Sequence, residues 1–303
     1  MFKARIVGSR DSIFRDKLTC DCYIRRMSTR DQVLQANIEV HTKMINDYES
    51  EPHWKPENIE KVTKRMQNLY PSDRESALDV GAGTGFLTRH LVKDFKKVNA
   101  IDITPAMLAK IPQFENLEVQ VCQVESLPFP DATFDFVCAY SFLHHLYDPV
   151  LALTEMIRVM KPNGVLYVDL EPNASYWASL KEISEREGIT LTPLVEREIN
   201  ATINIARQVS KQYEIKGSVF DTAEYSKSIT GGFKAGDLES SLCELGLGSV
   251  KVNLDWFMGQ GGVMHSQSFE LAREIEEYLR TALPASANLF KYLWFTGVKE
   301  RKS

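Results

Sequence analysis

The chain has 303 residues, a formal net charge of −5 and a hydrophobic content of 44%, which is normal for a globular core. Its longest apolar runs are shorter than the ~18 residues that a bilayer span needs, so we expect a soluble protein without a membrane span. The acidic balance disfavours nucleic acid as a partner, because a nucleic-acid groove needs clustered Lys and Arg. The five cysteines form no CxxC pair and favour free thiols in a reducing, cytoplasmic compartment. No pattern indicates a metal site or an oligomeric state.

The first 26 residues are rich in both basic and acidic side chains. They contain seven Lys or Arg residues and three aspartates, and Met27 follows them. A mitochondrial transit peptide is rich in Arg but poor in acids, so the aspartates weaken that interpretation. We expect residues 1–27 to be a disordered leader, with mitochondrial targeting as the alternative.

Two helices come next and predict an N-terminal helical lid over residues 28–72. In Thr29–Tyr48 the apolar side chains fall on one side at helical spacing. In Pro56–Leu69 the proline stands at a favourable first-turn position. A polar and aromatic connector that contains His53 and Trp54 joins the two helices.

From Glu75 onward, strands alternate with helices, which implies parallel βαβ units and a sheet covered on both faces. We expect residues 73–172 to form a cofactor-binding Rossmann-like core. The expected strands are Glu75–Val80, Lys97–Ile101, Leu117–Cys122, Phe134–Ala139 and Gly164–Leu170, and the expected helices are Thr84–Asp94, Pro105–Lys110 and Pro149–Met160.

After Glu171 the alternation stops. Ser175–Tyr213 is largely helical and too long for a plain connector, so residues 173–235 are expected to form a helical insertion that caps the substrate pocket. Residues 236–303 complete the sheet, with helices at Ala235–Leu245 and Ser266–Leu283 and strands at Ser249–Phe257 and Leu289–Val298. The predicted fold is α/β: a Rossmann-like, doubly wound, mostly parallel seven-stranded sheet with an N-terminal helical lid and a helical insertion after the fifth strand.

The most informative motif is Leu78–Phe86, in which a strand ends in an acid and a glycine-rich loop follows. A dinucleotide-binding loop has glycine at its first, third and sixth positions. Here the sixth position is Phe86, and this disfavours a nicotinamide-dependent oxidoreductase. Asp102 ends the second strand about 20 residues beyond the loop, where a carboxylate accepts hydrogen bonds from ribose hydroxyls. The alternative role of Asp102 is a solvated acid that caps the next helix.

Three further segments follow in order: Gln123–Asp131, Phe134–Leu146 and Val159–Gly164. With the glycine loop, they make the chain resemble the class I S-adenosylmethionine-dependent methyltransferases. It is most similar to the small-molecule branch with the ubiquinone/menaquinone methyltransferase-like enzymes. The ordered motifs cover about Tyr48–Leu170. The resemblance implies S-adenosyl-L-methionine as methyl donor and a small-molecule acceptor as partner.

The resemblance also implies which residues bind the cofactor. The glycine loop approaches its methionine part, and Asp79 lies near its ammonium group. Asp102 holds the ribose, and Val124 offers a backbone N–H to the adenine. Gln123 stands where the family often has an acid. The full expected set is Tyr48, Asp79, Gly81, Ala82, Gly83, Thr84, Gly85, Asp102, Ile103, Met107, Gln123, Val124, Glu125 and Tyr140.

Two adjacent histidines, His144 and His145, are the candidates for a general base. They follow the fourth strand, and an unperturbed pKa near 6.5 suits proton transfer at neutral pH. In the alternative, one packs under a helix and the other caps a turn. His53 is a second candidate, for which plain loop packing is favoured.

The function that we expect is methyl transfer to a small organic acceptor, which gives the methylated product and S-adenosylhomocysteine. A non-catalytic S-adenosylmethionine-binding protein and a protein or RNA methyltransferase remain as alternatives. The sequence names neither the acceptor nor the atom that is methylated.

Overall fold

The computed structural model describes residues 29–50, 52–188 and 190–301. The expected leader at residues 1–27 therefore lies outside the described residues. The predicted seven-stranded, mostly parallel sheet is confirmed, with the strand order β3-β2-β1-β4-β5-β7-β6. Strands β1 to β5 run parallel to one another, and β7 runs antiparallel to both β5 and β6. The strands are β1 (Ser76–Val80), β2 (Lys97–Asp102), β3 (Leu117–Val121), β4 (Phe134–Tyr140), β5 (Met160–Pro172), β6 (Leu247–Phe257) and β7 (Phe290–Lys299).

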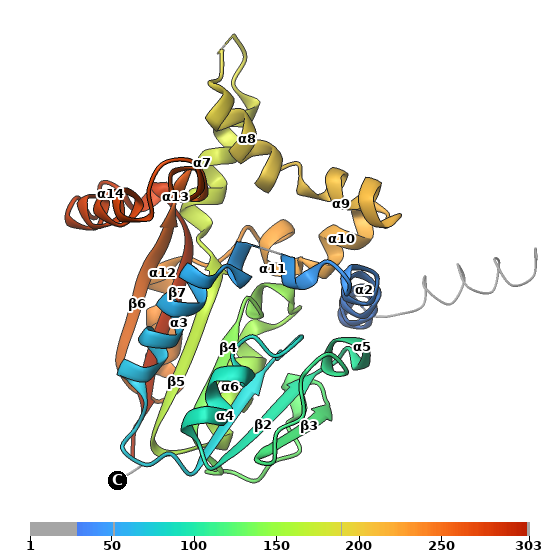
Figure 1. Cartoon of the computed structure of the whole chain (residues 1–303), viewed down its shortest axis with the longest axis vertical. Helices are drawn as coiled ribbons and strands as arrows, with labels where there is room; N and C mark the ends of the chain where they lie inside the picture. The colour runs from blue at the N-terminus through green and yellow to red at the C-terminus, as the bar shows by residue number, and fades with distance from the viewer. Residues whose placement is uncertain (1–28, 51, 189, 302–303) are drawn as a thin grey trace, which may run out of the picture.

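Helices cover both faces of this sheet, and further helices lie above the carboxyl ends of its parallel strands (Figure 1). The N-terminal half contributes α2 (Thr29–Met44), α3 (Pro56–Leu69), α4 (Thr88–Asp94), α5 (Pro105–Leu108) and α6 (Pro149–Val159). The C-terminal half contributes α7 (Ala174–Glu185), α8 (Pro193–Thr202), α9 (Ile205–Tyr213), α10 (Gly217–Ala223), α11 (Tyr225–Ser228), α12 (Ala235–Glu244), α13 (Gln260–Ser266) and α14 (Phe269–Thr281). The short 3-10 turns are η1 (Tyr48–Ser50), η2 (Pro52–Trp54), η3 (Val124–Ser126), η4 (Leu143–His145) and η5 (Ala287–Leu289). Among the described residues, no helix is both long and apolar enough to cross a bilayer.

Two hydrophobic layers join these helices to the sheet. On one face, Met156 of α6 and Leu242 of α12 belong to the same buried cluster as Leu78 and Val80 of β1. On the other face, α3 and α4 pack against the strand residues whose side chains point the opposite way. Successive side chains of a strand alternate between the two faces of a sheet. The sheet is therefore buried on both faces.

Several element boundaries differ from the sequence prediction, and two of them have identifiable reasons. Helix α4 begins at Thr88 and not at Thr84, because Gly81, Gly83 and Gly85 all have positive φ and keep the chain in a tight turn. Strand β5 begins at Met160 and not at Gly164, because Met160 already pairs with Phe134 before a bulge shifts the register.

The helices over the strand ends form a second small core. Ala36 and Val40 of α2 pack with Val209, Phe220 and Ala223 of α9 and α10. Residues 174–228 are largely helical, as expected for the insertion, which we call the cap. The predicted domain limits themselves stay predictions.

Candidate active site

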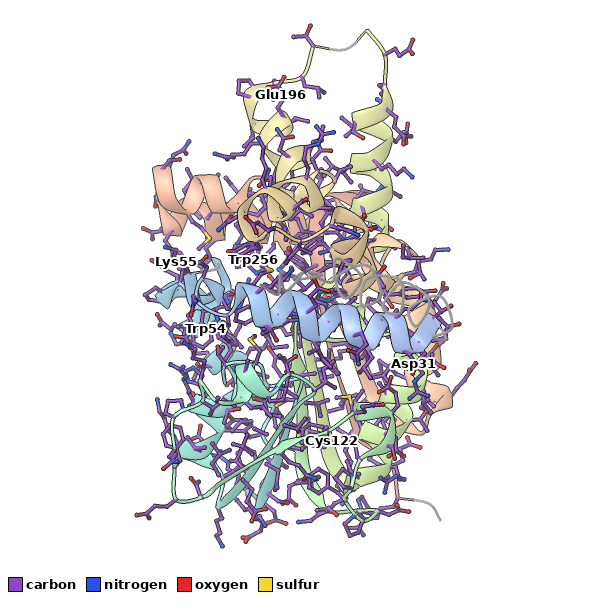
Figure 2. All side chains as sticks on the ribbon, turned by 90° about the vertical axis from the view of Figure 1, so that its right-hand side faces the viewer. Asp31, Trp54, Lys55, Cys122, Glu196 and Trp256 are labelled. Atoms are coloured by element: carbon purple, nitrogen blue, oxygen red, sulfur yellow. The ribbon has the colours of Figure 1, made fainter. Side chains whose placement is uncertain are left out.

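A pocket of about 840 Å³, part of which is open solvent, lies at the carboxyl ends of β1, β2 and β4. Helix α2 forms its roof, and the loops that follow the strands form its floor. Figure 2 shows α2 crossing the molecule between the cap and the sheet, with Asp31 on this helix and Cys122 below it; both residues line the pocket. Ligands of open α/β sheets bind at this edge, so the pocket has the position expected for a cofactor.

The glycine loop meets the pocket at Gly81 and Gly83, and at Gly81 it leaves no room for a side chain. A Cβ atom on Gly81, whose φ is +66°, would lie 2.0 Å from the ring of Phe142. At Gly83, a Cβ would face Met107 and Tyr48, which line the pocket as well. The backbone of this loop is therefore exposed to whatever fills the pocket, and it forms a cradle of the kind that cofactor-binding loops need.

Asp102 ties this loop to the end of β2. Its Oδ2 atom accepts a hydrogen bond from Gly83 N at 3.0 Å, and its Oδ1 atom accepts one from Thr104 N at 2.8 Å. A carboxylate has about four lone-pair sites, so two remain for ribose hydroxyls. The side chain lines the pocket and is half-buried. The free acceptor sites of Asp102 therefore fit the ribose of an adenosyl group.

The structure brings most of the predicted residues to the pocket wall. They are Tyr48, Gly81, Gly83, Asp102, Ile103, Met107, Gln123, Val124, Glu125 and His145. Glu125 also forms an ion pair with Arg30 of α2 at 3.6 Å, and this pair joins the roof to the adenine side predicted from the sequence.

Asp79 and Tyr140 lie behind the wall. Asp79 is 1% exposed and accepts a hydrogen bond from Thr88 Oγ1 at 2.5 Å. Burial raises the pKa of Asp79 to about 7, and the hydroxyl of Thr88 lowers it only in part. Tyr140 is buried, its hydroxyl accepts a hydrogen bond from Asn58 at 2.9 Å, and burial raises its pKa well above the ordinary value.

Four other predicted residues are also not part of the pocket wall: Ala82, Thr84, Gly85 and His144. A Cβ on Gly85 would press on Ile111 at 3.2 Å, so this glycine serves the packing of the loop against α5 and its C-terminal turn. The hydroxyl of Thr84 is buried without a hydrogen-bond partner.

The two candidate bases differ in position. His145 lines the pocket, and its Nδ1 atom lies 2.9 Å from the carbonyl oxygen of Ala223. Burial lowers its pKa well below the ordinary value, so it is neutral at pH 7. His144 is buried, with Nδ1 2.9 Å from Glu171 Oε2. Only His145 faces the pocket as a base would.

The third candidate, His53, is packed among aromatic rings. Its ring centroid lies 5.9 Å from that of Tyr48 and 5.7 Å from those of Phe86 and Tyr140. Burial lowers the pKa of His53 to about 4. It is not part of the pocket wall, which fits the packing role.

Sequence reasoning missed Glu171, which organises the turn η4. This fully buried carboxylate accepts hydrogen bonds from the backbone N–H groups of Phe142, Leu143 and His144, at 2.7 to 3.0 Å. Its only signal in the sequence is an acid at the end of an apolar strand. Asn37, the second missed residue, donates to the carbonyl oxygen of His145 at 3.0 Å and ties α2 to η4.

Comparisons with known proteins agree with this geometry. Residues 78–168 match the methyltransferase domain family. The demethylmenaquinone methyltransferase of Tropheryma whipplei is 31% identical over 162 residues, which are 52% of this chain and 62% of that protein. The malonyl-[acyl-carrier protein] O-methyltransferase of Halorhodospira halophila is 32% identical over 116 residues, which are 36% of this chain and 39% of that protein.

A structural neighbour supports the fold across most of the chain. An S-adenosylmethionine-dependent methyltransferase of Thermotoga maritima, described as a possible histamine N-methyltransferase, superposes with a TM-score of 0.53 and 16% identity, over 86% of this chain and 99% of that one. At this identity the likeness concerns the fold alone. The chain spans 39% and 62% of the length of the two curated relatives. The glycine cradle and Asp102 both lie within residues 78–168, the part of the chain that matches the methyltransferase domain family.

Proposed function

We propose that this protein transfers the methyl group of S-adenosylmethionine to a small organic acceptor and releases S-adenosylhomocysteine. The observation that carries the proposal is the contact between Asp102 and Gly83, because it joins the expected ribose-binding acid to the glycine cradle. The relatives are named for acceptors as different as demethylmenaquinone and malonyl-[acyl-carrier protein], so the acceptor is left open.

The residues of the pocket divide by chemistry into two ends. On this proposal, Ile103, Met107 and Val124 hold the adenine, and Asp102 holds the ribose. The other end is largely apolar but contains three polar side chains. The residues of this acceptor end are Val33, Leu34, Asn37, His41, Phe142, His145, Leu146 and Tyr147.

The chemistry asks for position more than for reactive side chains. The sulfonium of the donor carries an activated methyl group that a nucleophile displaces in line. Holding two reactants in near-attack geometry lowers a barrier by roughly 7–11 kcal/mol. The roof formed by α2 excludes water, and neutral His145 has a free lone pair for the proton of a hydroxyl acceptor.

Titration calorimetry with S-adenosylmethionine, S-adenosylhomocysteine and NADH tests the donor. We expect micromolar binding of the two sulfur ligands and none of NADH. Incubation with methyl-labelled donor and a panel of quinols, phenols, amines and carboxylic acids then tests transfer. Label in protein or RNA in place of the small molecules would redirect the proposal to a macromolecular acceptor, and binding without any transfer would leave a non-catalytic protein. The expected cytoplasmic compartment is checked by cell fractionation.

A further inference from the structure

The fold gathers two histidines and a glutamate that lie far apart in the sequence. His144 and His145 belong to η4, and Glu224 lies between α10 and α11 of the cap, about 80 residues later. One nitrogen of each histidine and one oxygen of Glu224 all lie within 4.8 Å of one another. We propose that His144, His145 and Glu224 bind one divalent transition-metal ion, of the zinc type, beside the acceptor end of the pocket.

The first argument is the second carboxylate behind His144. Glu171 is fully buried, and its Oε2 atom lies 2.9 Å from His144 Nδ1. The bond to this carboxylate keeps the proton on Nδ1, which leaves the lone pair on Nε2, and Nε2 lies 3.6 Å from Glu224 Oε2. Histidines that bind metals have this arrangement, in which the other ring nitrogen donates to a carboxylate.

The second argument is the spacing of the ligand atoms. Zinc binds nitrogen and oxygen ligands at about 2.1 Å, so two ligands of a tetrahedral site lie about 3.4 Å apart. His144 Nε2 lies 3.6 Å from Glu224 Oε2, and His145 Nδ1 lies 3.8 Å from the other carboxylate oxygen, Oε1. Each histidine therefore faces its own oxygen of Glu224 at a spacing close to that of a tetrahedral site. Coordination through His145 Nδ1 exchanges its bond to Ala223 for the metal and leaves the ring proton on Nε2, so His145 acts as a base only in the metal-free protein.

The third argument is the charge of the cluster. The carboxylate of Glu224 is buried, and its Oε2 atom is paired with the ammonium group of Lys227. An ion pair with an ammonium group requires an ionised carboxylate. Ionised carboxylate and neutral imidazole are the forms that bind a metal.

Lys227 is the competing cation. Its ammonium group pairs with Glu224 Oε2, and its side chain is 19% exposed, so it is able to turn toward solvent. An ion bound by three protein ligands keeps a coordination position for water or substrate. Because His145 lines the pocket, that position adjoins the acceptor end, where an acceptor oxygen would take it. The inference does not depend on methyl transfer, since metal binding is measured without donor or acceptor.

The test is a titration of the chelator-treated full chain with Zn²⁺ in competition with a chromogenic chelator. We expect one saturable site in the native chain, at least a hundredfold weaker in Glu224→Gln. The control variant Glu239→Gln removes an exposed glutamate of α12 and should bind as the native chain does. In Lys227→Met, the competing ammonium is gone and binding should be about tenfold tighter.

Lys227→Met also separates the proposal from a purely structural ion pair, even if Glu224→Gln does not fold. An ion pair without metal predicts a lower melting temperature and no gain of zinc affinity, and this result would overturn the proposal. Co²⁺ serves as a second probe: a spectrum of nitrogen and oxygen ligands supports the site. A sulfur charge-transfer band would assign the ion to a cysteine and refute it.

Discussion

At the residue scale, Asp102 combines a structural role with the proposed ribose-binding role. It holds Gly83 and Thr104 through both carboxylate oxygens. We expect Asp102→Ala to weaken S-adenosylmethionine binding by about 2 kcal/mol, because it removes charge-assisted hydrogen bonds to the ribose. Calorimetry measures the loss, and Glu118→Gln, an exposed acid of β3, is the matched control. Unchanged affinity in a folded Asp102→Ala protein would remove the ribose role.

The two glycines that line the pocket should respond differently to the same small change. At Gly81 an added methyl meets the ring of Phe142 at 2.0 Å, whereas at Gly83 the nearest atom is 3.5 Å away. Both residues have positive φ, which costs an alanine roughly 1–2 kcal/mol. We expect Gly83→Ala to show only this cost, and Gly81→Ala to displace Phe142 as well. The melting temperature and the donor affinity should both fall further in Gly81→Ala than in Gly83→Ala. Equal losses would mean that the ring of Phe142 moves away without cost.

The residue scale also shows where sequence reasoning ends. The glycines and Asp102 could be predicted because local backbone geometry dictates them. Asp79 was expected near the cofactor's ammonium group, a role that is still a prediction, and its contact with Thr88 depends on how α4 packs. The closeness of Glu224 to His144 depends on the path of the cap, which no local pattern encodes.

At the scale of elements, a buried charge cluster fastens α3 to the sheet. Arg65 of α3 pairs with Asp169 of β5 at 2.6 Å and with Asp255 of β6 at 2.9 Å. Because removing one partner leaves buried charges uncompensated, we expect Arg65→Met to lower the free energy of unfolding by about 3 kcal/mol. Lys64→Met, at an exposed position of the same helix, should change it by less than about 0.5 kcal/mol. Urea titrations measure both, and similar midpoints would contradict a stabilising role for the cluster.

The elements themselves were largely predictable, because strands and helices alternate with clear turn residues between them. The order of β6 and β7 in the sheet was not predictable from the sequence. Strand β7 lies between β5 and β6 and pairs antiparallel with both, although β5 and β7 are far apart in the sequence. Such pairing depends on tertiary packing and not on local propensity.

At the scale of the whole molecule, two buried groups give stability opposite dependences on pH. His53 has a folded pKa of about 4 against about 6.5 when unfolded, so its contribution is lost as the pH falls from 7. Asp79 has a folded pKa of about 7 against 3.8, so its contribution grows as the pH falls. Each effect amounts to about 2 kcal/mol between pH 7 and pH 5, and they nearly cancel.

Single variants should reveal how each group changes the free energy of unfolding with pH. We expect His53→Gln to become more stable from pH 7 to pH 5 relative to the native chain, and Asp79→Asn to become less stable over the same range. Denaturation at several pH values gives both differences. Parallel pH profiles for all three proteins would show that neither group titrates as its burial implies.

The position of α2 has a consequence for the order in which ligands enter. The helix roofs both ends of the pocket, packs with α10 of the cap, and reaches η4 through Asn37. On the proposed function, donor and acceptor would therefore both enter past α2, and any opening of this helix would disturb its contacts with the cap. A donor seated on the glycine loop would lie on the floor, beneath the space for the acceptor. We therefore expect compulsory-order kinetics, in which the donor binds first and S-adenosylhomocysteine leaves last.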